Sequence, residues 1–350
     1  MIAATVIGAT GYVGGELLRL IATHPEFELS AAVSSSRAGQ HIGRVFPHLA
    51  SDYREVAFSD SGDWLERLER GSKLALFSAA PHGASAAAVA QAMETGAARD
   101  VDMRVVDSSA DFRYSSASEF AAIYGVEHPV PQLLDQFLCA LPEHVKDSPK
   151  HNVGHPGCFA TAILLAAMPL VASGSVSGEL FVSGITGSTG SGRSPQAGTH
   201  HPERHSNLYA YKPHAHRHVP EVENLLRRTT KRDTQVLFVP HSGPFARGIH
   251  VTVQAKLADA TSEQELRQVV SDYYADAEFV EVVDGTPRLK DVVASNYCHI
   301  GVAVEGEYAV VMSTIDNLVK GAAGGAMQWM NRLWAIPECT GLQANAPAWT

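Results

Sequence analysis

The chain has 350 residues, of which 45% are hydrophobic and 18% are charged, and its formal net charge is −10. This length predicts two domains with a sizeable core, and the lack of a long low-complexity tract excludes a disordered protein. The acidic balance excludes general nucleic-acid binding, which needs a basic face.

The start of the chain lacks the basic segment and cleavage site of a signal peptide, and no apolar run reaches the roughly 20 residues of a membrane span. We therefore expect a cytoplasmic protein with no membrane partner. The cysteines lie far apart and fit neither a zinc pattern nor a dense disulfide framework, so we expect free thiols and no metal site. They are Cys139, Cys158, Cys298 and Cys339.

Short apolar runs alternate with helical stretches over the first third of the chain, which is typical of a parallel sheet covered by helices. Strands are predicted at 2–7, 29–33, 74–77 and 104–106, and helices at 13–24 and 83–95. The pattern predicts a doubly wound, Rossmann-type α/β domain that binds a nucleotide.

The composition changes near Pro149, and the later strands follow one another with hairpin-like turns, which predicts a mostly antiparallel sheet. Strands are predicted at 179–185, 235–240, 248–256, 298–304 and 308–313, and helices at 158–171, 220–228, 263–274 and 317–333. We expect a nucleotide-binding domain formed by residues 1–150 and 317–350. An α+β domain, residues 151–316, is inserted into it and carries catalysis, substrate binding and oligomerisation.

The first predicted strand ends in a glycine loop, Gly8-Ala9-Thr10-Gly11-Tyr12-Val13-Gly14. Glycines at this position allow a tight turn and let backbone N–H groups approach a pyrophosphate at the start of the next helix. An ordinary strand-to-helix turn is the alternative. We expect cofactor contacts from Gly8, Thr10, Gly11, Tyr12, Val13 and Gly14.

The second predicted strand is followed by Ser34-Ser35-Ser36-Arg37, where an enzyme that uses NAD would carry an acidic residue for the ribose hydroxyls. Hydroxyl groups and a cation suit a 2′-phosphate, so we expect NADP(H) bound through Ser34, Ser36 and Arg37. A solvated loop arginine is the alternative at Arg37.

A cysteine stands directly before the longest apolar helical run, in the segment His155-Pro156-Gly157-Cys158. The N–H groups and positive end of a helix lower the pKa of a thiol and can receive an oxyanion. Cys158 is therefore a candidate nucleophile, and the equally weighted alternative is that it only packs at the start of a helix.

Histidines and arginines gather in the loop from residue 200 to residue 218. No cysteine or carboxylate frames the histidines at familiar ligand spacing, so a catalytic imidazole is favoured over a metal site. Arginine holds carboxylate or phosphate groups through two parallel hydrogen bonds. The candidates for an anionic substrate are Arg193, Arg204, Arg217 and Arg247, and the alternative for at least two of them is an ordinary surface arginine.

Six blocks spread over the whole chain together resemble the N-acetyl-γ-glutamyl-phosphate reductase family of arginine biosynthesis. The blocks are Gly8–Gly14, Pro81-His82-Gly83, Ser109-Ala110-Asp111-Phe112-Arg113, Pro156-Gly157-Cys158, His216-Arg217-His218-Val219-Pro220-Glu221 and Asp316-Asn317-Leu318-Val319-Lys320-Gly321. The resemblance implies a glyceraldehyde-3-phosphate dehydrogenase-like fold and an NADP-dependent phosphorylating aldehyde dehydrogenase. It also implies a homotetramer.

The resemblance implies that Cys158 attacks an acyl phosphate to form a thioester and that His216 is the acid/base, with His218 as the second choice. It places Asn317 beside the nicotinamide. Further cofactor contacts are expected from Pro81 and Gly187, and substrate contacts from Arg113, Arg193, His218 and Arg247.

Departures from the family pattern at His155, Phe159 and Ala160 leave the acyl group of the substrate open. The stretch from His200 to Lys212 also resembles the lysine-pathway relatives, which reduce an aminoadipyl phosphate on an acidic amino-group carrier protein. The sequence is also compatible with an aspartate-semialdehyde dehydrogenase, a non-catalytic nucleotide sensor, and a cysteine hydrolase or acyltransferase without a nucleotide.

Overall fold

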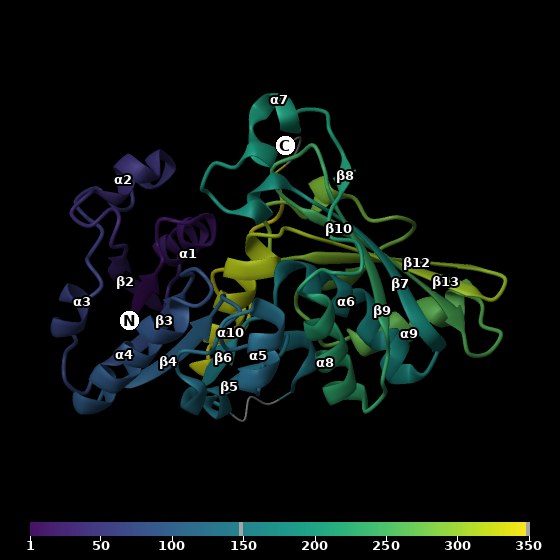
Figure 1. The fold of residues 1–350 in the computed structure, drawn as a ribbon, viewed down its shortest axis with the longest axis horizontal. Helices are drawn as coiled ribbons and strands as arrows, with labels where there is room; N and C mark the ends of the chain where they lie inside the picture. The colour runs from purple at the N-terminus through teal and green to yellow at the C-terminus, as the bar shows by residue number, and fades with distance from the viewer. Residues whose placement is uncertain (147–149, 348–350) are drawn as a thin grey trace. The chain divides into compact units, whose positions relative to one another are not determined.

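The computed structural model of the chain describes residues 1–146 and 150–347 and is drawn in Figure 1. The chain forms two units. The first contains Met1–Pro156 and Ala322–Gln343, and the second contains Gly157–Gly321 and the described residues from Ala344 onward. The predicted domain boundaries, after residues 150 and 316, stay a prediction.

The first unit is built on a six-stranded sheet in the order β2-β1-β3-β4-β6-β5, and every pair of neighbours is parallel. In each of its central strands, β1, β3 and β4, at least the last three residues are buried, as expected of a sheet covered on both faces. The strands are β1 (Ile2–Ile7), β2 (Phe27–Val33), β3 (Lys73–Ser78), β4 (Asp102–Asp107), β5 (Phe137–Cys139) and β6 (Asn152–Gly154).

Among the helices of the first unit, α1, α4 and α10 pack onto this sheet. In the first helix, α1, the buried stripe includes Leu17, Leu18 and Ile21, which recur at helical spacing. The helices are α1 (Tyr12–Ala22), α2 (Ile42–Val45), α3 (Asp63–Glu66), α4 (Ser85–Ala98), α5 (Ala117–Tyr124) and α10 (Gly324–Leu333), with short 3₁₀ turns at Pro47–Leu49, Pro131–Gln136 and Pro142–His144.

The second unit is built on a seven-stranded mixed sheet in the order β11-β12-β13-β10-β7-β9-β8. Four neighbouring pairs are antiparallel, whereas β11 with β12 and β7 with β9 are parallel. The strands are β7 (Val176–Thr186), β8 (Tyr209–Ala210), β9 (Val236–Ser242), β10 (Ile249–Leu257), β11 (Val280–Val282), β12 (Cys298–Glu305) and β13 (Tyr308–Ile315).

Three helices of the second unit, α6, α8 and α9, lie along one face of its sheet (Figure 1). The longest, α6, is apolar all round and buried from Phe159 to Val171, so it forms the centre of the core. The helices are α6 (Cys158–Ser173), α7 (His201–Arg204), α8 (Val219–Thr230) and α9 (Glu263–Tyr273), with short 3₁₀ turns at Ser188–Ser191, Ala197–Thr199 and Leu289–Asp291.

The predicted final helix, residues 317–333, divides into two parts. A π-helical turn occupies Val319–Ala323, and the α-helix α10 begins only at Gly324. In the π turn the Gly321 N–H donates to the Asp316 carbonyl, five residues back. The periodicity of the sequence predicts a helix here but does not distinguish the wider turn, which is typical of functional sites.

Candidate active site

The glycine loop follows the carboxyl end of β1 and leads directly into α1 (Tyr12–Ala22). A Cβ atom at Gly8 or Gly14 would come within 2.6 Å of the backbone of neighbouring segments, so both positions require glycine. At Gly11 a Cβ would meet only the Gly8 carbonyl, at 3.6 Å, and Gly11 provides no side-chain cap for α1. The start of α1 therefore fits an anionic pyrophosphate.

Hydroxyl groups gather beside this loop, at the carboxyl end of β2. The Ser34 Oγ lies 3.2 Å from the Thr10 Oγ1 and 3.4 Å from the Ser36 Oγ. Arg37 is exposed and donates to the Gln40 side chain at 3.3 Å. The structure thus brings the predicted cofactor residues Thr10, Ser34 and Ser36 together. It leaves the Arg37 guanidinium at the surface, and the arrangement of hydroxyls and a cation fits a 2′-phosphate.

Two buried carboxylates support the loops that follow β3 and β4 in the same sheet. Asp111 accepts the N–H groups of Gly83, at 2.8 Å, and Ala86, at 2.9 Å, and so caps α4, which has no cap of its own. Asp107 accepts the Ser85 and Ser109 hydroxyls at 2.6 Å. Burial raises the pKa of Asp107 to about 6 against these stabilising hydrogen bonds.

The candidate nucleophile Cys158 is the first residue of α6 and is half-buried. The segment that delivers it is fixed by Glu221, a side chain only 1% exposed near the start of α8. Its Oε1 atom accepts the Gly157 N–H at 2.7 Å, across 64 residues of sequence. Glu221 therefore holds the backbone directly before the thiol, a contact that no sequence spacing indicates.

His216 lies among aromatic rings close to the start of α6. Its ring centroid is 5.6 Å from that of Phe159, 5.5 Å from that of Phe238 and 4.7 Å from that of His218. Its Nδ1 accepts the His218 backbone N–H at 3.2 Å, which assigns the proton of the neutral ring to Nε2. His216 therefore presents an N–H donor at Nε2.

The pKa of His216 is lowered to about 4, first by burial and then by the positive charges of Arg217 and Lys212. The imidazole is consequently neutral at physiological pH, and the imidazolium form is a minor species. This favours a neutral hydrogen-bond donor over a charged acid at this position.

Tyr211 completes the cluster and was not among the predicted site residues. Its ring centroid lies 5.9 Å from that of His216. Burial raises its pKa, and the nearby Cys158 contributes in the same direction, which places the phenol within electrostatic reach of the thiol. The phenol therefore keeps its proton at neutral pH and provides an uncharged O–H group to this cluster.

Several other predicted residues are already engaged within their own units. Arg247 directs Nε to the Asp316 carboxylate at 3.0 Å. Asn317 accepts the Gly248 N–H at 2.7 Å and donates to the Thr189 hydroxyl at 3.0 Å. These contacts show a supporting role for both side chains, and their ligand contacts stay predictions.

Arg113 is 6% exposed and donates to the carbonyls of His155, at 2.9 Å, and Ser108, at 3.0 Å. It therefore fixes the loop between β6 and the second unit. Arg193 is exposed, in the loop after β7. At Gly187 a Cβ would overlap with the backbone of Ala246, so this position requires glycine for packing alone.

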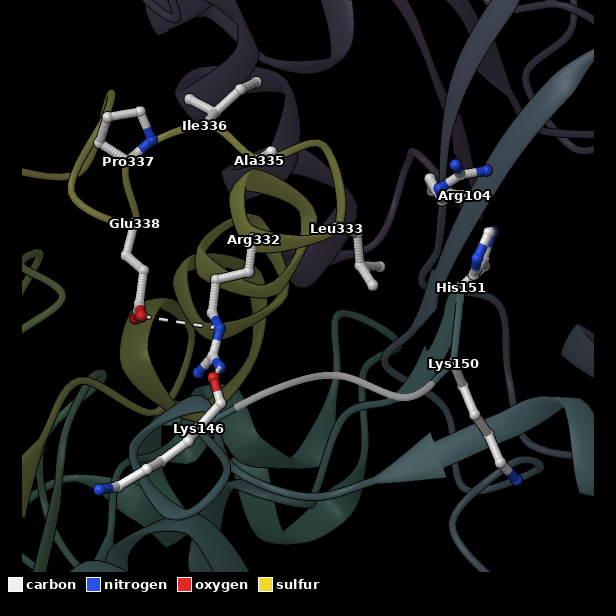
Figure 2. A pocket seen from close by; sticks show the side chains of 10 residues that line it. All are labelled: Arg104, Lys146, Lys150, His151, Arg332, Leu333, Ala335, Ile336, Pro337 and Glu338. Atoms are coloured by element: carbon white, nitrogen blue, oxygen red, sulfur yellow. Dashed lines mark hydrogen bonds and ion pairs between the residues drawn. The ribbon is translucent and has the colours of Figure 1, made fainter.

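A cavity of about 600 Å³ lies elsewhere in the first unit, at the amino ends of β4 and β6 (Figure 2). Arg104 and His151 line one side, and Arg332 and Leu333 of α10 line another. Arg332 pairs with Glu338 at 3.6 Å. Because the nucleotide loops follow the carboxyl ends of the strands, this cavity lies at the opposite edge of the sheet and does not belong to the cofactor site.

Within residues 1–146 and 150–347, no group of three or more His, Cys, Asp or Glu side chains is placed to hold a metal ion. Among the same residues, no helix has the length and apolar character to cross a bilayer.

Two family models match the chain over regions close to the two units. Residues 3–146 match the semialdehyde dehydrogenase NAD binding domain, and residues 158–317 match the semialdehyde dehydrogenase dimerisation domain. N-acetyl-gamma-glutamyl-phosphate reductase of Methanopyrus kandleri is 40% identical over 98% of both chains, and that of Pseudomonas aeruginosa is 37% identical over 99% of both. The chain belongs to the N-acetyl-γ-glutamyl-phosphate reductase family.

Solved structures share this fold at low sequence identity. Aspartate semialdehyde dehydrogenase II of Vibrio cholerae, complexed with ASA, has a TM-score of 0.69 at 14% identity, over 96% of this chain and 98% of that one. The enzyme of Candida albicans with NADP has a TM-score of 0.66 at 17% identity, over 96% and 98%. The comparisons confirm the predicted family and fold class. They also confirm that the chain is an oxidoreductase of the class that uses a nicotinamide cofactor.

Proposed function

We propose that the chain reduces N-acetyl-γ-glutamyl phosphate to N-acetylglutamate 5-semialdehyde and phosphate, with NADPH as the reductant, in arginine biosynthesis. The observation that carries the proposal is the cluster of Cys158, His216 and Tyr211 at the start of α6, in a chain with a nucleotide-binding glycine loop. The identity of the substrate's acyl group is inferred from the relatives, because those compared above are named for acetylglutamyl phosphate.

Cys158 carries the covalent step. Its sulfur loses the thiol proton and attacks the acyl carbon, the bond from carbon to the phosphate oxygen breaks, and phosphate leaves with the electron pair and takes up a proton. The product is a thioester on Cys158. The first N–H groups of α6 and the positive end of the helix stabilise both the thiolate and the oxyanion.

NADPH, when bound, supplies the hydride that reduces the thioester to the aldehyde level. His216 donates a hydrogen bond from its Nε2–H to the tetrahedral oxyanion and keeps its proton, because its pKa of about 4 leaves the ring a neutral imidazole. The carbonyl reforms as the carbon–sulfur bond breaks, and Cys158 recovers the electron pair as a thiolate. A thiolate is a good leaving group at this step, whereas an alkoxide is a poor one.

For the cofactor, we propose contacts from the glycine loop and from Ser34, Ser36 and Arg37, with NADP(H) preferred over NAD(H). Pro81, Gly187 and Asn317 are the further proposed contacts. For the anionic groups of the substrate, we propose Arg113, Arg193, His218 and Arg247. A cytoplasmic location stays part of the proposal.

A homotetramer is proposed as the assembled form. In the second unit, α6, α8 and α9 cover one face of the sheet. On the other face, Phe181 of β7 is 56% exposed and Tyr308 of β13 is 58% exposed, which suits a surface between copies. Light scattering on the purified protein tests this: a monomer at micromolar concentration contradicts it.

The lysine-pathway reaction on a carrier-linked aminoadipyl phosphate is not favoured, because the compared relatives are named for the acetylglutamyl substrate. The reverse reaction tests the proposal directly. Purified protein, NADP, phosphate and N-acetylglutamate semialdehyde should give rising NADPH absorbance. Reduction of NADP with aspartate semialdehyde alone would contradict the proposed substrate.

A further inference from the structure

The π turn Val319–Ala323 touches the nucleophile through a residue without a side chain. A Cβ atom at Gly321 would lie 2.8 Å from the Cys158 Cβ, 3.2 Å from the Cys158 Cα and 3.3 Å from the Ile315 Cδ1. All three distances are shorter than the usual separation of carbon atoms in contact, about 3.5–4.0 Å, and the contact with the Cys158 Cβ is the shortest. The bare backbone at Gly321 therefore forms the surface against which the start of α6 packs.

The π turn is held firmly from its other side. Asp316, fully buried, accepts the N–H groups of Leu318, at 2.8 Å, and Val319, at 3.0 Å, as well as the Arg247 Nε. Lys320 is 1% exposed, and its ammonium lies 5.5 Å from the centroid of the Phe279 ring. The turn thus has little freedom to withdraw from α6.

The start of α6 is held as well, through the Gly157 N–H bound to Glu221 and the Thr161 N–H bound to the Gly157 carbonyl, both at 2.7 Å. A side chain at residue 321 would therefore press on the group that it meets first, Cys158, whose Cβ would lie 2.8 Å away. Cys158 stands at the first position of its helix.

We propose that Gly321 is a positioning residue for the nucleophile: the π turn aligns it with Cys158, and its missing side chain fixes where the thiol stands. The proposal rests on the proposed role of Cys158. It predicts that a single added methyl group displaces the thiol by a fraction of an ångström. Misplacement on the scale of 1 Å costs about 10²-fold in rate.

Gly321→Ala tests the proposal, with Gly62→Ala as the matched control. Gly62 also has a negative φ, and a Cβ there would meet no atom within 4 Å. We expect Gly321→Ala to lower kcat by about 10–100-fold with the KM for NADP unchanged, and to alter the rate of Cys158 alkylation by iodoacetamide, measured by peptide mass spectrometry. The Gly62 variant should match the wild type in all three.

Ile315→Val supplies a rescue. It removes the Cδ1 atom that lies 3.3 Å from the added Cβ, so the added methyl group gains room beside residue 315. We expect the double variant to recover part of the lost kcat and to move the alkylation rate back toward the wild-type value, a coupling that independent sites do not show.

A folded Gly321→Ala protein with wild-type kcat and alkylation rate would overturn the proposal. Failure of both the single and the double variant to fold would also overturn it, since the overlap requires only a small local shift. The proposed function fails separately: if Cys158→Ser retains turnover, the sulfur is not the nucleophile, whatever Gly321→Ala does to its alkylation.

Discussion

The glycine loop of the first unit and the nucleophile cluster of the second unit are built in opposite ways. The loop is one short segment that offers backbone atoms; glycine is required at residue 14 by contact with Gly8 and Ala9 of the loop itself, and at residue 8 by contact with the backbone of Ala79 and Ala80. The cluster uses side chains from segments far apart: Cys158 begins α6, and Tyr211 and His216 come from the long loop before α8. A site made of one segment can be recognised from its pattern, whereas a cluster depends on the fold.

The two regions share one electrostatic property. In the first unit burial raises the pKa of Asp107 to about 6, and in the second burial lowers the pKa of His216 to about 4. In both cases the low polarity of the surroundings favours the uncharged form. The stability contributed by the two groups therefore changes with pH in opposite directions, so an experiment can distinguish them.

The largest effect is expected at the nucleophile. Cys158→Ser should lower the rate of the reverse reaction by more than about 10³-fold, because a hydroxyl is a weaker nucleophile and a poorer leaving group. NADPH binding, measured by fluorescence titration, should be unchanged, since the glycine loop belongs to the other unit. Loss of NADPH binding would show that the two sites are not independent.

His216 should come next. His216→Asn removes the donor at the Nε2 position and should lower kcat by about 10²–10³-fold, measured with saturating NADP and semialdehyde. His216→Gln is the matched variant, because its longer amide places an N–H near the lost Nε2–H, and it should keep more activity. Equal losses in the two variants, or an equal loss in His218→Asn, would remove His216 from the role.

Gly11→Ala separates folding from binding in the glycine loop. The added methyl group meets only the Gly8 carbonyl, at 3.6 Å, so the thermal midpoint should stay close to that of the wild type. It extends into the space for the pyrophosphate, and the loss of charge-assisted hydrogen bonds should weaken NADPH binding by about 10–100-fold. Gly14→Ala should instead lower the thermal midpoint, because its Cβ overlaps with Ala9.

Acid should destabilise the protein partly through His216. Above its ordinary pKa of 6.5 the imidazole is neutral in both the folded and unfolded chain. Between pH 6.5 and its folded pKa of about 4, only the unfolded chain binds the proton, so stability falls. The loss is about 2 kcal/mol at pH 5 relative to pH 7.5.

Urea unfolding of the wild type and His216→Asn at both pH values measures this loss. Asp107 affects the free energy of unfolding with the opposite sign. Because its pKa is raised in the folded chain, its contribution to stability is lost as the pH rises through about 6. The difference between the two proteins isolates His216, because Asp107 is common to both. An equal pH dependence in the two proteins would contradict the lowered pKa.

The smallest effect is expected at Arg37, which is exposed and bound only loosely to Gln40. Arg37→Ala should reduce the preference for NADPH over NADH by about tenfold, as one charge-assisted hydrogen bond to a phosphate is lost. The ratio of kcat/KM values for the two cofactors measures it. A wild-type protein that prefers NADH would refute the assignment of the serine-rich loop.

The sequence predicts what local patterns determine: both sheets, the glycine loop, the start of α6 at Cys158 and the family. It does not indicate β5 and β6, which have three residues each and no readable periodicity. Nor does it reveal the bond between Glu221 and Gly157 or that between Arg247 and Asp316, because each joins segments more than sixty residues apart. The role of Tyr211 also depends on the fold, because Tyr211 and Cys158 belong to different segments of the chain and no pattern in the sequence indicates their proximity.

The central claim is that the acyl group passes through the Cys158 sulfur. Incubation with N-acetyl-γ-glutamyl phosphate in the absence of NADPH, followed by peptide mass spectrometry, tests it most directly. The account predicts an N-acetylglutamyl group on the peptide that contains Cys158, removed when NADPH is added. An unmodified Cys158 in an enzyme that still turns over, or an acyl group found on another residue, would contradict it.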